Sequence, residues 1–188
     1  MARLSPFLVL LLALALPACA APEAGEPAAQ ALRAPDVRYE PTPQRVVRQM
    51  LRLAEVGPGD VVYDLGSGDG RIPITAAREF GARGVGIEID PRLIGRAEAN
   101  AIEAEVTERV QFRNEDLFEA DFSDATVVTL FLYPDVNLRL RPRLLAELAP
   151  GTRVVSYWHD MGDWEPERSI RAGGARLYLW RIPARTGE

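Results

Sequence analysis

The chain has 188 residues, of which 47% are hydrophobic and 26% charged, which suits one globular domain with a sizeable core. Its net charge of −5 argues against a protein that coats nucleic acids, since such a protein needs a basic face. The chain has one cysteine, Cys19, and one histidine, His159. These numbers exclude an intramolecular disulfide and a cysteine-cluster metal site and disfavour a zinc enzyme, so we expect no metal site.

The N-terminal residues resemble an export signal. Residues 7–16 form an uncharged apolar run that follows Arg3 and is shorter than the roughly 20 residues of a membrane span. Residues 18–20 fit a small-x-small cleavage site, whereas residues 16–19 resemble a lipobox in which Cys19 carries lipid. We therefore expect residues 1–20 to be a signal peptide or lipoprotein anchor. This places the domain in the periplasm or on a membrane, with a cytoplasm-facing anchor as the alternative.

Residues 21–36 are rich in alanine, proline and glutamate and predict a flexible linker. The folded domain is expected over residues 37–184. Its first helix is predicted to begin with Thr42 as N-cap and Pro43 as the first helical residue. Apolar residues then recur on one helical face between residues 46 and 54.

A buried strand, an acid and a glycine turn follow, over residues 61–70. Gly66, Gly68 and Gly70 allow positive φ and close approach of a ligand to the backbone, and the amides of the next helix favour an anionic or polar partner. A dinucleotide site needs glycine where Arg71 stands, so this turn disfavours an NAD-dependent oxidoreductase. A tight turn without any ligand is the simpler alternative.

Strands alternate with helices over the rest of the domain. Further strands are predicted at residues 84–89, 110–113, 125–132 and 152–157, with helices after Asp90 and from Asn137 to Ala149. Residues 169–182 predict a hairpin around Gly173 and Gly174, and a loop at residues 159–167 replaces a helix. The pattern predicts an α/β fold with a mostly parallel sheet that ends in an antiparallel C-terminal hairpin.

Acidic residues lie where the first three strands end. Asp64 ends the first, Glu88 lies near the end of the second, and Asp116 follows the third. Ligands of such sheets bind at these carboxyl ends. The carboxylate of Glu88 lies about where a ribose-binding acid is expected and can accept hydrogen bonds from both ribose hydroxyls. Each acid taken singly could instead cap a turn or face solvent, so it is their combination beside the glycine turn that predicts a nucleotide-like cofactor.

Residues 39–164 resemble a family of class I S-adenosyl-L-methionine (SAM) methyltransferases. This family includes the protein-lysine N-methyltransferases that act on the c subunit of ATP synthase and on the adenine nucleotide translocase. The shared residues are Tyr39 to Pro43, the turn from Asp64 to Gly70 with Arg71-Ile72, and Gly86 to Asp90. The resemblance implies a Rossmann-like seven-stranded sheet, SAM as cofactor, and methyl transfer to a lysine amino group of a protein.

The resemblance also implies roles for individual residues. Asp64, Gly66, Gly68 and Gly70 would hold the methionine end of SAM, Glu88 would bind its ribose, and Asp116 the adenine amino group. On the acceptor side, Tyr133 and Asn137 are candidates to line the acceptor pocket, with ordinary loop packing as the alternative.

A noncatalytic exported binding module with the same fold is the competing hypothesis. It is motivated by the signal-like segment, because a protein outside the cytoplasm has no evident supply of SAM.

Overall fold

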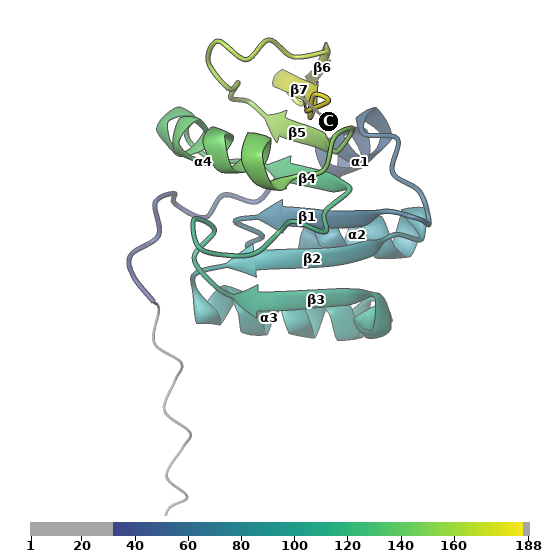
Figure 1. The fold of residues 1–188 in the computed structure, drawn as a ribbon. Helices are drawn as coiled ribbons and strands as arrows, with labels where there is room; N and C mark the ends of the chain where they lie inside the picture. Colours follow the sequence, from purple (N-terminus) through teal and green to yellow (C-terminus); the bar gives the residue numbers. More distant parts are fainter. Residues whose placement is uncertain (1–31, 186–188) are drawn as a thin grey trace, which may run out of the picture.

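Seven strands form one sheet in the order β3-β2-β1-β4-β5-β7-β6 in the computed structural model, which describes residues 32–185 (Figure 1). The first five strands are parallel, and β7 pairs antiparallel with β5 and β6. The strands are β1 (Val61–Leu65), β2 (Arg83–Glu88), β3 (Val110–Asn114), β4 (Val127–Leu130), β5 (Arg153–Tyr157), β6 (Arg168–Ala172) and β7 (Ala175–Arg181). This architecture confirms the predicted α/β fold with its C-terminal antiparallel hairpin.

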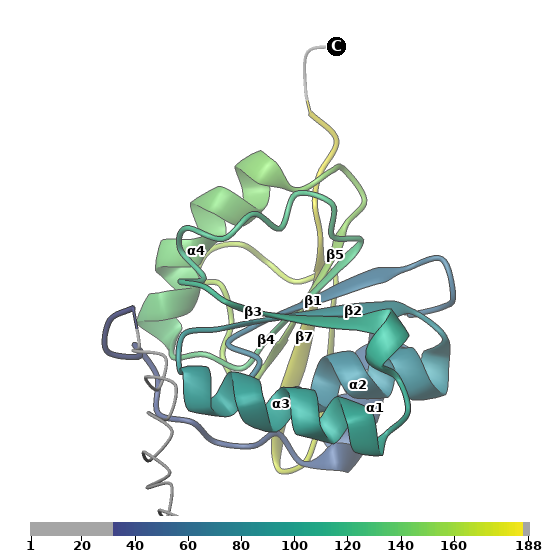
Figure 2. The same ribbon diagram turned by 90° about the horizontal axis from the view of Figure 1, so that it is seen from below.

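Helices cover both faces of the sheet (Figure 2). One face carries α1 (Gln44–Leu53), α2 (Arg71–Phe80) and α3 (Pro91–Glu103), and the other carries α4 (Pro134–Glu147). A short 3₁₀ turn, η1 (Thr107–Arg109), precedes β3. The central strands are buried on both sides, since α1 and α2 contribute to one apolar cluster and α4 to the other.

Two helix starts differ from the prediction. Helix α1 begins at Gln44 with Pro43 at its N-cap, and no side chain caps it. Thr42 is buried instead, and its carbonyl accepts a hydrogen bond from Arg71 Nη1. Helix α4 begins at Pro134 rather than Asn137, because proline suits the first helical position, where no N–H is needed.

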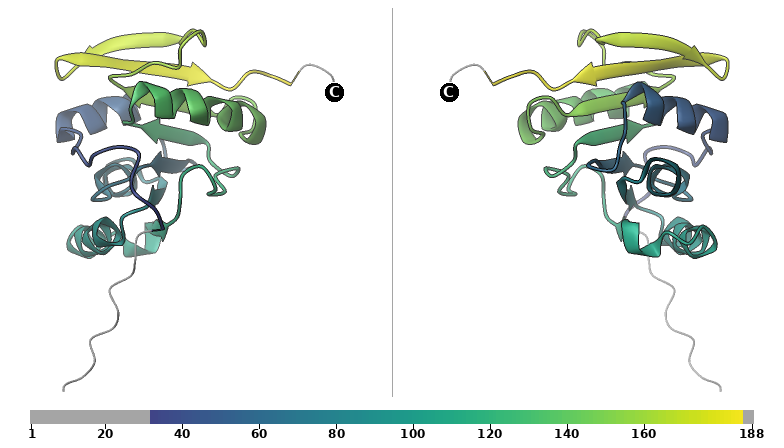
Figure 3. Two further views of the ribbon diagram at one scale, coloured as in Figure 1. Left: turned by 90° about the vertical axis from the view of Figure 1, so that its left-hand side faces the viewer. Right: turned by 90° about the vertical axis from the view of Figure 1, so that its right-hand side faces the viewer.

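The hairpin and the loop before it agree with the prediction. No helix lies between β5 and β6 in the described residues, and Gly173 and Gly174 form the β6–β7 turn with φ of 59° and 90°. Figure 3 shows this hairpin at the opposite end of the sheet from β3.

An N-terminal segment, residues 33–42, crosses the carboxyl ends of the strands before α1 begins (Figures 1 and 3). We call it the strap. Arg33 pairs with Asp36 and Asp116, and Asp36 also pairs with Arg139 of α4. These ion pairs attach the start of the strap to Asp116 after β3 and to α4.

Residues 1–31 lie outside the described part of the chain. The predictions of a signal peptide or anchor over residues 1–20 and of lipidation at Cys19 fall there, as does most of the linker predicted over residues 21–36. Within residues 32–185, no helix has both the length and the apolar character that a membrane span requires.

Candidate functional site

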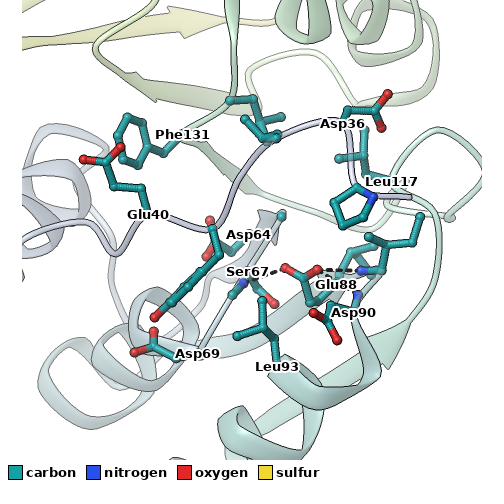
Figure 4. A pocket seen from close by; sticks show the side chains of 18 of the residues that line it. Asp36, Glu40, Asp64, Ser67, Asp69, Glu88, Asp90, Leu93, Leu117 and Phe131 are labelled. Carbon is teal, nitrogen blue, oxygen red and sulfur yellow. Dashed lines mark hydrogen bonds between the residues drawn. The ribbon is translucent and has the colours of Figure 1, made fainter. Parts of the chain in front are cut away.

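A cavity of about 480 Å³ lies where β1 and β2 end and α2 and α3 begin (Figure 4). It is lined by the strap, the glycine turn at residues 66–69, the ends of β1 and β2, the start of α2, and the residues that follow β2, β3 and β4. It therefore occupies the edge of the sheet at which ligands of doubly wound folds bind. Asp64, Glu88 and Asp116, which the sequence places at three separate strand ends, all line it.

The glycine turn brings bare backbone to this cavity. Gly66 and Gly68 have φ of 84° and 54°, a region that favours glycine. The amides of Gly66 and Ser67 both donate to the carbonyl of Ile87 at 2.9 Å, which ties the turn to β2. A Cβ on Gly68 would lie 2.6 Å from the ring of Tyr39, so the strap rests directly on this glycine.

Gly70 serves the packing of α2. It is not among the residues that line the cavity, and it occupies the N-cap of α2 with φ of 76°. A Cβ there would lie 2.6 Å from the ring of Phe112 and 2.8 Å from Cβ of Ala97. Gly70 therefore allows α2 to pack closely against β3 and α3 and shapes the cavity indirectly.

We expect Gly68→Ala to destabilise the fold and to displace the strap. The left-handed conformation alone costs an alanine about 1 kcal/mol, and the clash with the Tyr39 ring adds to it. Urea unfolding measures the loss, and limited proteolysis of the strap measures its displacement. The double variant Gly68→Ala with Tyr39→Ala removes the clash, so the two changes should cost less together than the sum of their separate effects. If the losses in unfolding free energy of the two single variants simply add in the double variant, residue 68 and the Tyr39 ring are not in contact.

Asp64 is a buried carboxylate at the floor of the cavity. It is 4% exposed, and its Oδ1 accepts a hydrogen bond of 2.7 Å from Thr129 Oγ1. Burial raises the pKa of Asp64 to about 8, helped by the charges of Glu88 and Asp69 and opposed by the Thr129 hydrogen bond. No described residue forms an ion pair with it, so this site suits a positively charged group of a ligand.

Glu88 links the glycine turn to the start of α3. Its Oε2 accepts from the amide of Gly68 at 2.9 Å, and its Oε1 accepts from the amides of Ile89 and Asp90 at 2.8 and 2.9 Å. The residue is 8% exposed and lines the cavity. Three backbone donors thus hold this carboxylate in one orientation at the predicted ribose position.

Asp116 lies at the cavity as predicted, but its carboxylate is engaged. Arg33 donates from Nε to Oδ2 and from Nη2 to Oδ1, the latter at 2.8 Å, and the amide of Phe118 also donates to Oδ1 at 3.0 Å. The Arg33 hydrogen bonds lower the pKa of Asp116. The predicted adenine partner is therefore paired, in this structure, with a residue of the strap.

Neither of the two candidates for the acceptor pocket, Tyr133 and Asn137, lines the cavity. Tyr133 is 47% exposed at the start of α4. Asn137 is fully buried, and its Nδ2 donates to the carbonyl of Asp160 at 3.2 Å and to that of His159 at 3.4 Å. Because α4 starts at Pro134, Asn137 lies one turn inside the helix and holds the loop that follows β5. Phe131 and Leu132 line the cavity in their place.

Sequence reasoning missed Arg33 and Glu40 of the strap. Both line the cavity, as Tyr39 does, although they lie far from the glycine turn in the sequence. The one available signal was the run from Tyr39 to Pro43, which belongs to the family resemblance.

The cavity fits SAM by the chemistry of its lining. SAM carries an ammonium and a sulfonium, and Asp64 is a buried carboxylate that no described cation neutralises. Its ribose needs acceptors, and Glu88 presents a fixed carboxylate. Gly66 and Gly68 leave the turn without side chains, so the methionine portion can lie against the backbone. Asp64, Gly66, Gly68 and Glu88 are thus the residues that would hold this cofactor.

Comparison with known proteins agrees with this fit. Residues 64–168 match the family described as ANTKMT methyltransferase domain. The chain is 49% identical over 153 residues to a protein-lysine N-methyltransferase of Saccharolobus islandicus, covering 79% of this chain and 95% of that protein. It is 36% identical over 147 residues to the mouse adenine nucleotide translocase lysine N-methyltransferase, covering 78% of this chain but 63% of the mouse protein.

Among solved structures, one described as an RNA methyltransferase of Salinibacter ruber in complex with S-adenosyl-L-homocysteine superimposes with a TM-score of 0.77. It is 58% identical and covers 79% of this chain and 97% of that one. A SAM-dependent methyltransferase of Geobacter sulfurreducens, also in complex with S-adenosyl-L-homocysteine, is 27% identical with a TM-score of 0.55, covering 62% of this chain and 48% of that one. The chain therefore belongs to the ANTKMT family of class I methyltransferases, enzymes whose cofactor is S-adenosyl-L-methionine.

Proposed function

We propose that this enzyme transfers a methyl group from SAM to the side-chain amine of a lysine in a protein. The observation that carries the proposal is the acidic lining of the cavity, in which Glu40, Asp64 and Glu88 form no ion pair with any described residue. Such a lining favours a cationic acceptor in addition to a cationic cofactor. The names of the archaeal and mouse relatives give the same acceptor for those proteins.

The residues of this chain contribute mainly by positioning. Bound SAM supplies an electrophilic methyl group on a sulfonium sulfur. Asp64 and Glu88 fix two ends of the cofactor site, so the reactive part is held between them and the strap. A lysine ammonium must first lose one proton, and the proton can pass to solvent because the cavity is open to it.

An RNA acceptor is the second candidate, because the Salinibacter structure is described as an RNA methyltransferase. The charge of the chain argues against it, since 27 acidic residues outnumber 22 basic ones. Of the four arginines that line the cavity, Arg33, Arg71 and Arg92 are moreover paired with carboxylates, and Arg38 alone forms no ion pair with a described residue. An RNA backbone needs unpaired cations, so we favour a protein acceptor.

The test uses the purified protein, methyl-labelled SAM and an extract of the source organism. Calorimetry first establishes SAM binding. Labelled transfer should then be sensitive to protease and insensitive to ribonuclease, and acid hydrolysis should yield methylated lysine. Label removed by ribonuclease would support the RNA acceptor instead. SAM binding without any transfer would favour the noncatalytic binding module.

We also propose that residues 1–20 bring the domain to a membrane or export it, with Cys19 as the candidate lipid site. The apolar run and the small residues around Cys19 support this proposal. Membrane fractionation of the wild type and of Cys19→Ser tests lipid attachment, and a reporter active only outside the cytoplasm tests the side of the membrane. A wild-type chain found only in the soluble cytoplasmic fraction would contradict it.

A further inference from the structure

The carboxylates around the cavity fall into two groups. Most are neutralised by a neighbouring arginine: Asp36 and Asp116 by Arg33, Asp69 by Arg71, Asp90 by Arg92, and Glu115 more loosely by Arg113 at 3.9 Å. Glu40, Asp64 and Glu88 have no ion pair with a described residue. Asp64 and Glu88 already match the cofactor. Glu40 is exposed and matches no part of it, so its charge is available for another partner.

Glu40 lies at a particular end of the cavity. Figure 4 shows it beside Phe131, whereas Glu88 and Asp90 lie at the opposite end, with Asp64 between them. If Glu88 takes the ribose and Asp64 the methionine portion, the end with Glu40 and Phe131 is left for the acceptor. The partly buried Phe131 lines this end directly after β4.

A row of aromatic rings leads from this end to the surface. The ring of Phe131 lies 4.8 Å from that of Tyr157, measured between centroids, and Tyr157 lies 5.8 Å from Trp158. Tyr157 is buried and Trp158 is 51% exposed. Aromatic faces attract ammonium groups and also accommodate the methylene stem of lysine.

The backbone of Trp158 has a strained conformation. Trp158 has φ of 76°, unusual for a residue other than glycine, and its amide donates to the carbonyl of Arg176 at 2.8 Å. A bulky residue held in this conformation costs free energy, and such strain is concentrated at functional sites. The residue with this unusual conformation carries an exposed ring next to the buried Tyr157.

Other charges face this entrance. Arg38 of the strap also lines the cavity. Arg45 lies near the Tyr157 hydroxyl, because a Cβ placed on Gly173 would be 3.7 Å from Nη2 of Arg45 and 3.1 Å from that hydroxyl. Burial raises the pKa of Tyr157, Arg45 lowers it, and Glu40 raises it. Glu40 is therefore close enough to Tyr157 for its charge to act there, while Arg45 acts from the side of the hydroxyl.

We propose that Glu40, Phe131 and Trp158 form the entrance for the acceptor side chain and select a cationic, unbranched amine such as lysine. This inference rests on the proposed lysine methyltransfer and names the residues that receive the substrate. Glu40 attracts the ammonium, and the rings of Phe131 and Trp158 hold the stem on its way to the cavity. Tyr157 supports both rings from within the core.

The test separates acceptor binding from cofactor binding. Methyl-lysine formation is measured with methyl-labelled SAM at increasing concentrations of desalted protein extract from the source organism. Glu40→Gln should raise the apparent KM for the extract about fivefold, and Phe131→Leu about tenfold, through loss of charge attraction and of the aromatic face. The Kd for SAM, measured by calorimetry, should stay unchanged in both. n-Butylamine, a mimic of the lysine side chain, should inhibit the wild type more than Glu40→Gln.

Two further variants and one control make the result specific. Glu40→Asp should restore part of the loss and Glu40→Lys should deepen it, because the effect follows charge at an exposed position. Glu98→Gln, on the exposed face of α3, is the matched control and should change neither constant. If the wild type is active and the apparent KM is unchanged in both Glu40→Gln and Phe131→Leu, the proposed entrance is wrong and the proposed function stands. A wild type that binds SAM but forms no methyl-lysine would overturn both.

Discussion

Replacing Asp64 with asparagine is expected to weaken SAM binding about a hundredfold while making the ligand-free protein more stable at pH 8. Removing a buried charge that pairs with a cationic ligand costs roughly 3 kcal/mol, which corresponds to that factor. The same charge is unfavourable without ligand, because Asp64 is buried and Thr129 is the one described residue that donates a hydrogen bond to it. An asparagine oxygen can accept that bond, so the variant keeps the contact and loses the charge.

The stability of the folded protein depends on pH because the pKa of Asp64 is raised. An unfolded aspartate titrates near 3.8, and Asp64 in the folded protein titrates near 8 because burial disfavours its charge. Between these values the folded protein holds a proton that the unfolded chain lacks. The contribution of Asp64 to stability is thus fully present below the lower value and is lost as the pH rises through 8, by up to about 1.4 kcal/mol per pH unit.

Urea unfolding at pH 5 and pH 8 measures this difference. The wild type should lose free energy of unfolding relative to Asp64→Asn as the pH rises, and the two proteins should approach each other at low pH. Calorimetry of SAM binding at pH 7 in buffers of different ionisation enthalpy should show proton release by the wild type and much less by the variant. Parallel stability profiles for the two proteins would show that Asp64 is ionised in the free enzyme.

The second large effect is expected at Glu88. Glu88→Gln presents an amide NH₂ either to the amide of Gly68 or to those of Ile89 and Asp90, so a donor faces a donor. A buried N–H that loses its charged acceptor costs about 2 kcal/mol. Thermal unfolding should therefore occur at a lower temperature, and SAM binding should weaken about tenfold or more, because the turn and the ribose site depend on the same carboxylate.

Glu115→Gln is the matched control for Glu88→Gln. Glu115 lines the same cavity, but its ion pair with Arg113, the one it forms among residues 32–185, is long at 3.9 Å. Glu115→Gln should therefore alter neither the unfolding temperature nor the Kd for SAM appreciably. Equal behaviour of the two variants would mean that Glu88 acts through general charge in the cavity and not through its three backbone hydrogen bonds.

The fold and the cofactor side of the site could be predicted because local patterns encode them. Apolar strands alternate with amphipathic helices, and parallel strands place their carboxyl ends at one edge, so Asp64, Glu88 and Asp116 had to meet there. The positions of Gly66 and Gly68 followed from backbone geometry. Gly70 is also a glycine of this turn, so the sequence does not distinguish it from Gly66 and Gly68. Only the packed structure shows that its missing side chain makes room for Phe112 and Ala97.

The parts that the strap and the residues after β4 and β5 play could not be predicted, because they depend on contacts distant in sequence. Arg33 pairs with Asp116 across 83 positions, and nothing in an alanine- and proline-rich segment marks it for packing. The predicted start of α4 was three residues late, which directed attention to Asn137 instead of Phe131. The ring of Trp158 reaches the surface through an unusual φ, which no periodicity indicates.

The course of the strap has one further consequence. The described chain starts at Leu32, beside the mouth of the cavity and not at the far edge of the sheet. A surface that held the residues directly before Leu32 would therefore lie near the opening of the cavity. A methyl acceptor on that surface would meet the enzyme at a high effective concentration, so attachment and choice of acceptor would be coupled by geometry alone.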